Sequence, residues 1–207
     1  MPDFSLEQNA IDQGHCPVCG VDEAGRGPWA GPVIAGAVIL DMNNLPDLLR
    51  SGLDDSKKLN APKRALLFEA LQDCAQIGVG MATVQEIDDI NILQGTLMAM
   101  QRAVANLPQA PSFALVDGNR PPSLECAVRT VIKGDGLSLS IAAASIVAKV
   151  TRDRIMVDLA NRHPGYGWER NAGYGTPQHQ RGLAKLGITD HHRRSFAPIA
   201  KLLDPIS

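Results

Sequence analysis

The sequence lacks the features that mark membrane, secreted and highly charged proteins. No stretch approaches the roughly 18 consecutive apolar residues that a membrane-spanning helix needs. Residues 1 to 14 are polar and acidic, without the basic and apolar regions of a secretory signal, so we predict a cytoplasmic protein. The net charge is only −2, which gives no global sign of a nucleic-acid partner. Any surface for such a partner must therefore be local.

Cysteine is also scarce, with four residues at positions 16, 19, 74 and 126. Without a secretory signal, reduced thiols are expected rather than disulfides. Cys16 and Cys19 have the spacing of half a zinc site, but a structural zinc ion needs four ligands, and the other two cysteines stand alone. We therefore expect no zinc, and the role of Cys16 and Cys19 stays open.

Several catalytic signatures are missing, along with internal repeats and low-complexity tracts. There is no phosphate-binding loop of nucleoside triphosphatases and no Gly-x-Ser-x-Gly elbow of serine hydrolases. The segment from Gly25 to Ala30 does fit the dinucleotide-binding fingerprint. However, Pro28 and Pro32 flank the loop, and a β-branched run follows where a helix should open. An oxidoreductase is therefore rejected.

What the sequence does contain is the composition and pattern of one globular α/β domain. Its 207 residues are 44% hydrophobic and 20% charged, which is ordinary for a soluble fold. Strands come first, then helices and strands alternate, which predicts a mixed sheet with helices against it. We expect a flexible leader over residues 1–16, a main domain over 17–160 and a helical C-terminal extension over 161–207, packed on the same domain. The expected strands are 18–22, 31–40, 78–84, 113–116 and 126–132, and the expected helices start at Asn60 and Asn91 or cover 138–159, 177–186 and 198–203.

The stretch from Val21 to Pro32 organises the chain. Asp22 and Glu23 end a short β-prone segment, and a glycine-punctuated loop with one arginine follows. Carboxylates held close together repel at neutral pH, and a bound cation relieves that repulsion. Hard divalent ions such as Mg²⁺ take carboxylate, water and phosphate oxygens. The pair thus indicates metal-assisted phosphate chemistry, although an isolated Asp-Glu pair is more often a charged turn.

Two further aspartates stand where predicted strands end. Asp117 precedes Gly118, and Asp135 lies between two glycines 18 residues later. Strand ends beside glycine are where α/β sheets place ligand groups. Each aspartate alone is more often a simple turn residue. Their coincidence with Asp22 and Glu23 makes one four-carboxylate site the better interpretation.

The segment 161–194 is locally basic. It carries six basic and two acidic side chains in a chain whose net charge is negative.

These motifs, in this order, resemble type 2 ribonuclease H, the ribonuclease HII family, from Val21 through Phe196. The residues that carry the resemblance are Asp22-Glu23-Ala24-Gly25-Arg26-Gly27-Pro28, Gly31-Pro32-Val33, Asp55-Ser56-Lys57-Lys58-Leu59, Val116-Asp117-Gly118-Asn119, Lys133-Gly134-Asp135, the run from Ala143 to Asp153, Gly173-Tyr174-Gly175-Thr176 and the run from His191 to Phe196.

The resemblance implies a ribonuclease-H-like mixed five-stranded sheet flanked by helices and a metal-dependent endonuclease. Its substrates would be the RNA strand of RNA–DNA hybrids and single ribonucleotides in duplex DNA, cut on the 5′ side to leave 5′-phosphate and 3′-hydroxyl ends. Such enzymes act in removing RNA primers and misplaced ribonucleotides. Two Mg²⁺ or Mn²⁺ ions would be held by Asp22, Glu23, Asp117 and Asp135. The nucleic acid would meet Gly25, Arg26, Gly27, Lys57, Lys58, Tyr174, Arg193 and Arg194.

Two rivals on a similar fold are a non-catalytic nucleic-acid binder and a junction resolvase. The binder would not need four carboxylates, which repel phosphate unless metal is bound. The resolvase would not need the Gly25–Gly27 loop with Tyr174. We expect Asp153 to pair with Arg152 or another basic side chain rather than with a metal ion, and the protein to be a monomer. For Ser145 and Lys149, support of the site and plain packing of a helix on the sheet both stay open. No partner-docking motif is evident in residues 200–207, and the sequence does not choose between Mg²⁺ and Mn²⁺.

Overall fold

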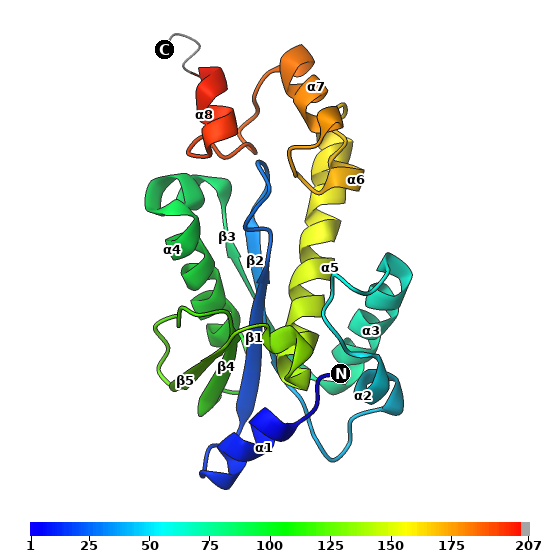
Figure 1. Ribbon diagram of the computed structural model, residues 1–207, viewed down its shortest axis with the longest axis vertical. Helices are drawn as coiled ribbons and strands as arrows, with labels where there is room; N and C mark the ends of the chain where they lie inside the picture. Colours follow the sequence, from blue (N-terminus) through cyan, green and yellow to red (C-terminus); the bar gives the residue numbers. More distant parts are fainter. Residues whose placement is uncertain (204–207) are drawn as a thin grey trace.

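A five-stranded mixed sheet forms the centre of the computed structural model, which describes residues 1–203 (Figure 1). The strand order is β3-β2-β1-β4-β5. The first three strands in this order pair antiparallel, whereas β1, β4 and β5 run parallel. The predicted fold class is thus confirmed. The strands are β1 (Val18–Ala24), β2 (Val33–Ile39), β3 (Gln76–Ala82), β4 (Phe113–Asp117) and β5 (Ala127–Val131).

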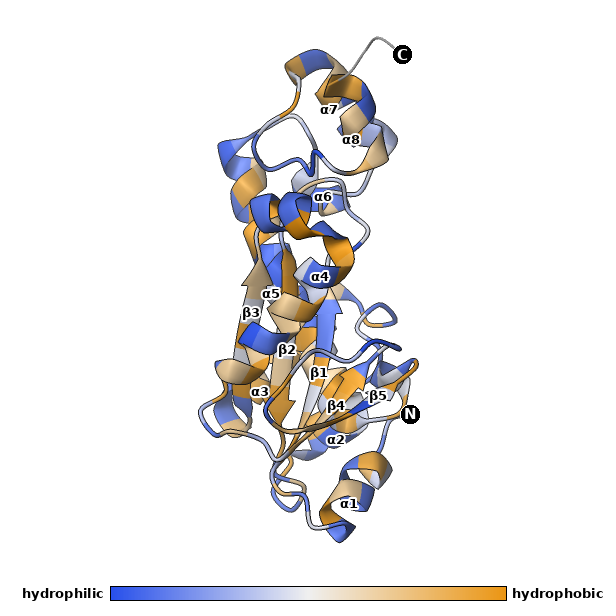
Figure 2. Cartoon of the chain, turned by 90° about the vertical axis from the view of Figure 1, so that its left-hand side faces the viewer, coloured by the Kyte–Doolittle hydropathy of each residue, from blue (hydrophilic) through white to orange (hydrophobic). Residues whose placement is uncertain are grey.

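Helices cover both faces of the sheet. Helix α5 (Leu139–Arg162) packs on β1 and β2 from one side, and α4 (Val84–Ala105) packs on β2 and β3 from the other (Figure 1). Small residues let the layers approach closely, since a Cβ on Gly36 would lie 2.6 Å from the carbonyl oxygen of Ala144. Strand β2 is hydrophobic and buried along its whole length (Figure 2). The sheet centre is therefore fixed between two apolar layers.

Helix α4 begins earlier than the sequence suggested. Thr83 and Glu86 form a capping box, each side chain accepting a hydrogen bond from the other's backbone N–H. The expected start, Asn91, is a break within the helix, with φ 70° and ψ 166°. Its side chain still accepts from the N–H of Leu93 and Gln94, as a cap would. The predicted cap was real, but it opens the second half of a kinked helix.

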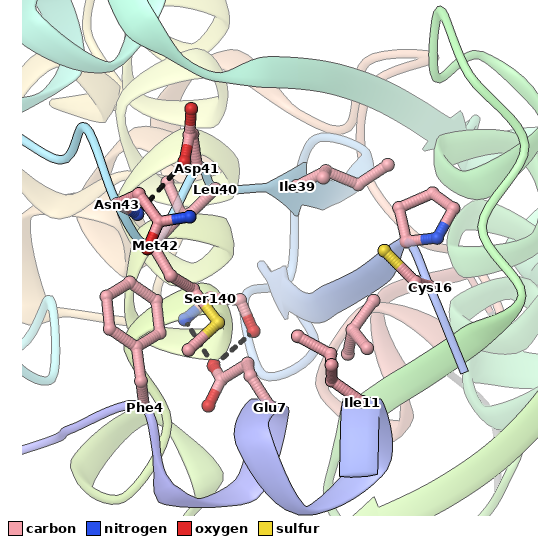
Figure 3. Close-up of a pocket in the computed structure, with 12 residues that line it drawn as sticks. Phe4, Glu7, Ile11, Cys16, Ile39, Leu40, Asp41, Met42, Asn43 and Ser140 are labelled. Carbon is pink, nitrogen blue, oxygen red and sulfur yellow. Dashed lines mark hydrogen bonds between the residues drawn. The ribbon is translucent and has the colours of Figure 1, made fainter. Parts of the chain in front are cut away.

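The expectation of a flexible leader was wrong for residues 5–12, which form helix α1 (Ser5–Asp12). Glu7 is buried, and its Oε1 accepts from the hydroxyls of Ser138 and Ser140 and from the N–H of Ser140. Asp3 also bridges to Ser138. The partners lie more than 130 residues away, so no local pattern reveals them. Figure 3 shows Glu7 and Ser140 beside a cavity of about 250 Å³ lined mainly by apolar side chains.

The remaining helices lie beyond β2 and beyond α5. Residues 41–59, which lie outside the expected strands and helices, contain the short helix α2 (Asp47–Gly52). Helix α3 (Ala61–Cys74) follows, and Asn60 caps it. After α5 come α6 (Trp168–Asn171), α7 (Pro177–Leu186) and α8 (Ala197–Leu203), gathered at one end of the molecule (Figures 1 and 2). The predicted extension continues to residue 207, and residues 204–207 lie outside the described part. No helix within residues 1–203 is long and apolar enough to cross a membrane.

Candidate active site and nucleic-acid interface

The end of β1 places two carboxylates side by side. Asp22 is buried, and Glu23 follows it one residue before the strand ends at Ala24. Burial raises the pKa of Asp22 well above its ordinary value, and the charges of Glu23 and Asp117 raise it further. The Ser145 hydroxyl of α5 and the N–H of Glu23 act in the opposite direction. The strand end thus holds a carboxylate whose negative charge is poorly compensated by the protein.

The neighbouring strand ends bring two more carboxylates to this edge. Asp117 ends β4, and its Oδ1 accepts from the N–H of Gly134 at 2.7 Å. That bond ties β4 to the short 3₁₀ turn η1 (Gly134–Gly136), which carries the buried Asp135. Burial raises the pKa of Asp135, as do the charges of Asp55 and Asp117. The electrostatic coupling links all four predicted carboxylates at one edge of the sheet.

Lys57 and Lys58 differ although they are adjacent. Burial opposes the positive charge of Lys57, but Asp22, Asp55 and the other two aspartates of the edge outweigh it and raise its pKa. Lys58 points to solvent and pairs with Asp54 at 3.1 Å. Sequence reasoning missed Asp55, which interacts with Asp135. Its position in the quoted Asp55–Leu59 motif was the available signal.

The donor set fits hard divalent cations, although the side chains do not yet form a coordination shell. Among the residues that the structure describes, no three His, Cys, Asp or Glu side chains form a group that could hold an ion. Asp22 accepts from the N–H of Glu23, Glu23 pairs with Arg26, and Asp117 accepts from Gly134. These carboxylates therefore engage local donors while still repelling one another. All are oxygen ligands of the kind that Mg²⁺ and Mn²⁺ accept, and such ions also use water and substrate phosphate.

A pocket of about 590 Å³ adjoins this edge and contains the Gly25–Gly27 loop. Arg26, which lies 3.3 Å from Glu23, and Tyr174, which has 51% of its surface exposed, also line this pocket. A Cβ on Gly27 would lie only 3.3 Å from a ring carbon of Tyr174. The structure thus brings together the loop, the tyrosine and the carboxylate Glu23. Basic groups from α3 and α5, Arg64 and Lys149, complete the wall.

Supporting contacts run along α5. Lys149 Nζ donates to Asp153 at 2.6 Å, and Arg64 lies 3.9 Å from the same carboxylate. Asp153 is thus paired with cations, as expected. The hydroxyls of Ser56 and Ser145 hydrogen-bond at 2.8 Å, which fastens the Asp55–Leu59 segment to the helix behind Asp22.

Arg193 does not lie where a residue contacting DNA should lie. Its side chain is fully buried and donates to the carbonyls of Gly25, Arg26 and Gly31. The expectation that Arg193 touches the DNA backbone is therefore wrong, because its guanidinium N–H groups donate to backbone carbonyls inside the protein. Arg194 remains exposed, next to Asp190 at 3.4 Å, and its contact with nucleic acid stays a prediction.

An aromatic and histidine cluster that sequence reasoning missed lies behind Tyr174. His179 Nδ1 is 3.0 Å from the carbonyl oxygen of Tyr174, and His179 Nε2 is 3.0 Å from His192 Nε2. Trp168 donates its indole N–H to His179 Nε2 as well. The only arrangement that satisfies these atoms has Nδ1 of His179 protonated and donating to Tyr174, because His192 Nδ1 accepts from the N–H of Thr189. The tyrosine segment is therefore held from behind by neutral imidazoles.

The cysteines give no sign of a metal or disulfide site. All four are free thiols; Cys19 is buried in β1, whereas Cys16 is exposed. Burial, above all, raises the pKa of the Cys19 thiol. The two therefore differ in environment despite their close spacing.

Comparison with known proteins identifies the family. A sequence model described as Ribonuclease HII matches residues 19–199. Proteins named ribonuclease HII are 61% identical in Parvibaculum lavamentivorans, covering 99% of this chain and 75% of the relative, and 58% identical in Paramagnetospirillum magneticum, covering 98% and 99%. Among solved structures, ribonuclease H2 from Pyrococcus horikoshii superposes with a TM-score of 0.78 at 30% identity, covering 91% and 97% of the two chains. The ribonuclease HII of Archaeoglobus fulgidus, solved with PCNA, gives 0.65 at 25%, covering 85% and 93%. The sequence motifs, the mixed sheet and these matches together show that this chain belongs to the ribonuclease HII family.

Proposed function

We propose that this ribonuclease H is a metal-dependent endonuclease that cuts the RNA strand of RNA–DNA hybrids and nicks duplex DNA 5′ to a single ribonucleotide. Hydrolysis of hybrids follows from membership of the family. The finer specificity is supported by one observation: Gly27 and the half-exposed Tyr174 face each other beside Glu23. A sugar bound in the pocket that both residues line would lie close to Glu23, which lines the same pocket.

The chemistry of selection favours this arrangement. A 2′-hydroxyl is the group that separates RNA from DNA at a given nucleotide, so selection requires contacts close to it. The backbone of Gly25–Gly27 can approach a sugar closely because no side chain projects from either glycine. The ring of Tyr174 would stack on the following deoxyribose and leave no room for a second 2′-hydroxyl. A junction between ribose and deoxyribose would then fit best.

The reaction would take place at the four carboxylates. Asp22, Glu23, Asp117 and Asp135 would hold two divalent ions, which supply an activated water and stabilise the leaving 3′-oxygen. Lys57 stands among these acids and would face the phosphate. Arg26 offers a fork of donors suited to a second phosphate. Hydrolysis at this edge would leave 5′-phosphate and 3′-hydroxyl ends.

The proposed partner is a nucleic-acid duplex, and the proposed state is a monomer. Exposed basic groups such as Arg194 and Lys58 would contact the phosphate backbone. The known complex with PCNA is a property of the Archaeoglobus protein. For the present chain, residues 204–207 are outside the described structure, and we propose no clamp partner.

The test is cleavage of a labelled DNA duplex containing one ribonucleotide, with Mg²⁺, Mn²⁺ or a chelator. Wild type is compared with Asp22→Asn and Asp117→Asn. The matched control is Asp73→Asn, which alters an exposed aspartate on α3. We expect metal-dependent nicking immediately 5′ of the ribonucleotide in wild type and control, and loss of nicking in the two site variants.

Two results would contradict the proposal. Binding of the duplex without cleavage under any metal would leave only a binding protein. Cleavage of an all-RNA hybrid together with no cut at a single ribonucleotide would remove the finer specificity and keep the hybrid activity.

A further inference from the structure

Two arginines lie buried behind the Gly25–Pro32 loop without a carboxylate partner. Arg193 is 0% exposed and Arg152 is 1% exposed. Within residues 1–203, neither has an acidic oxygen within 4.0 Å. Burial lowers the pKa of Arg152 to about 10 and that of Arg193 to about 9, so both stay charged at neutral pH. Burying an unpaired cation is unfavourable unless other groups satisfy its donors.

Backbone carbonyls of the loop satisfy Arg193. Its Nη2 donates to Gly25 at 2.6 Å and to Gly31 at 2.8 Å, its Nη1 donates to Arg26 at 2.9 Å, and its Nε donates to Gly31 at 3.0 Å. The backbone N–H of Arg193 also donates to Trp29. One guanidinium therefore spans both ends of the loop, a geometry that only a planar fork of donors can reach.

Arg152 holds the loop from α5 and joins it to the tyrosine segment. Its Nε donates to Pro32 at 3.0 Å, its Nη2 to Ala30 at 3.2 Å and its Nη1 to Ala172 at 3.0 Å. Ala172 lies two residues before Tyr174. A Cβ on Gly25 would lie 2.0 Å from the Nε of Arg152, so a glycine is required for the arginine to sit there. Arg152 thus fixes how far the loop lies from the tyrosine.

The two arginines engage the carbonyl groups of the loop but not its N–H groups. The carbonyls of Gly25 and Arg26 are engaged on the protein side. Among the residues that the structure describes, the N–H groups of Gly25, Arg26 and Gly27 have no backbone or side-chain acceptor. The three residues line the pocket that contains Glu23 and Tyr174. Their N–H groups are therefore available as donors to an oxygen on a bound sugar or phosphate.

We propose that Arg152 and Arg193 are positioning residues that set selectivity for the 2′-hydroxyl by holding the Gly25–Gly27 loop at a fixed distance from Tyr174. They act through the loop: Arg193 does not line the pocket, and Arg152, although it lies at the pocket wall, is 1% exposed and donates to loop carbonyls. The inference rests on the proposed function, since it assigns the loop to ribose recognition. It also gives different roles to two adjacent arginines of one motif. Arg193 would position the loop from inside the protein, and Arg194 would contact nucleic acid at the surface.

The test pairs protein variants with substrate variants. Wild type, Arg193→Lys and Arg152→Lys each cut a duplex whose single ribonucleotide carries a 2′-hydroxyl or, instead, a 2′-fluorine. Arg154→Lys is the control, since Arg154 is an exposed arginine of the same helix. In wild type the fluorine substitution should lower kcat by a large factor. A lysine keeps the charge but cannot reach the same carbonyls, so we expect kcat on the hydroxyl substrate to fall at least about tenfold.

The decisive quantity is how much the loss of kcat caused by replacing the 2′-hydroxyl with fluorine differs between wild type and each lysine variant. If the loop is misplaced, the penalty for removing the 2′-hydroxyl should shrink at least about fivefold in both lysine variants, whereas Arg154→Lys should keep the wild-type penalty. The dependence of the logarithm of duplex affinity on salt should keep its wild-type slope in Arg193→Lys and Arg193→Met. A direct phosphate contact would instead lower the slope by about 0.9 in Arg193→Met.

An unchanged fluorine penalty in both lysine variants, or a reduced salt slope in Arg193→Met, would overturn the positioning role. So would loss of folding in both lysine variants, measured by near-ultraviolet circular dichroism, because it would assign the arginines to stability alone. If wild type itself does not distinguish hydroxyl from fluorine, the proposed function fails first.

Discussion

The carboxylate edge and the arginine pair are two buried groups of like charges, and the protein treats them in opposite ways. Burial, and then the neighbouring acids Glu23 and Asp117, raise the pKa of Asp22, so its charge is left for something outside the chain to balance. Arg152 and Arg193 also lack counter-charges, but six different backbone carbonyls accept their hydrogen bonds. The carboxylate edge therefore leaves negative charge for a ligand to balance, whereas hydrogen bonds within the protein already satisfy the arginine pair. Buried charge without a partner thus distinguishes the proposed site from the arginines that support it.

The largest effect should follow from removing an acid of the edge. Asp117→Asn keeps the size and the acceptor for the Gly134 N–H but removes one negative charge. Because charge stabilisation at such a site is worth several kcal/mol, we expect kcat to fall at least about 10³-fold. Steady-state cleavage of an RNA–DNA hybrid measures it. A loss below tenfold would show that Asp117 is not part of the reacting set.

A smaller effect concerns the histidines behind Tyr174. Burial lowers the pKa of His192 to about 4, with His179, His191 and His163 adding repulsion. The unfolded chain takes up this proton near pH 6.5, whereas the folded chain resists until about pH 4. Stability should therefore fall as pH drops through this window, by about 3 kcal/mol for this group. Urea unfolding of wild type and His192→Asn between pH 7 and 4 checks it, since the variant should lack this part of the slope.

The acids of the edge should change the stability of the folded chain with pH in the opposite direction. The folded-state pKa of Asp22 is raised, so its proton binds more readily to the folded chain and stability from this group rises as pH falls. Asp22→Asn should accordingly be more stable than wild type in metal-free buffer at neutral pH, by about 1–2 kcal/mol. Chemical unfolding with chelator present measures the gain. Added Mn²⁺ should narrow the difference by stabilising wild type alone. A variant less stable than wild type under chelator would contradict the repulsion argument.

The smallest effects distinguish the two adjacent lysines. Lys57 lies among the acids and Lys58 lies at the surface with Asp54. We expect Lys57→Met to reduce kcat about tenfold, because a positive charge is lost beside the acids that we propose to hold the reacting phosphate. Lys58→Met should alter only the salt dependence of duplex binding, by a slope of about 0.9, with stability changed by less than about 0.5 kcal/mol. Equal kinetic effects of the two variants would remove this distinction.

Sequence reasoning predicted the sheet better than its surroundings. Strands such as β1 and β4 end at acid-glycine motifs that local chemistry makes visible, so their ends fell within two residues. Helix α1 escaped because a polar stretch acquires its structure from Ser138 and Ser140, far along the chain. The family was also readable, because many motifs occurred in order.

The approach of the predicted acids to one edge of the sheet could be read from the sequence, whereas the placement of the basic residues could not. An acid beside glycine at one strand end is often only a turn residue, but such acids at several strand ends indicate one shared edge. An arginine in a basic segment, by contrast, suits either surface or interior. Nothing in the pair Arg193-Arg194 tells which residue is buried. The mutual engagement of Asp55 and Asp135 likewise depends on tertiary approach that spacing does not encode.

The contact between Glu7 and Ser138 spans 131 residues of sequence. A ribosome that makes this chain must therefore complete two thirds of it before the first helix can find its partners. Contacts of such long range are slow to form because the intervening chain must be ordered first. The N-terminus, although made first, should be among the last segments to dock. Asp3 exchanges backbone hydrogen bonds with Leu137 and Leu139, directly after the turn that carries Asp135, so this end of the acidic edge would gain its outer contacts only late in folding.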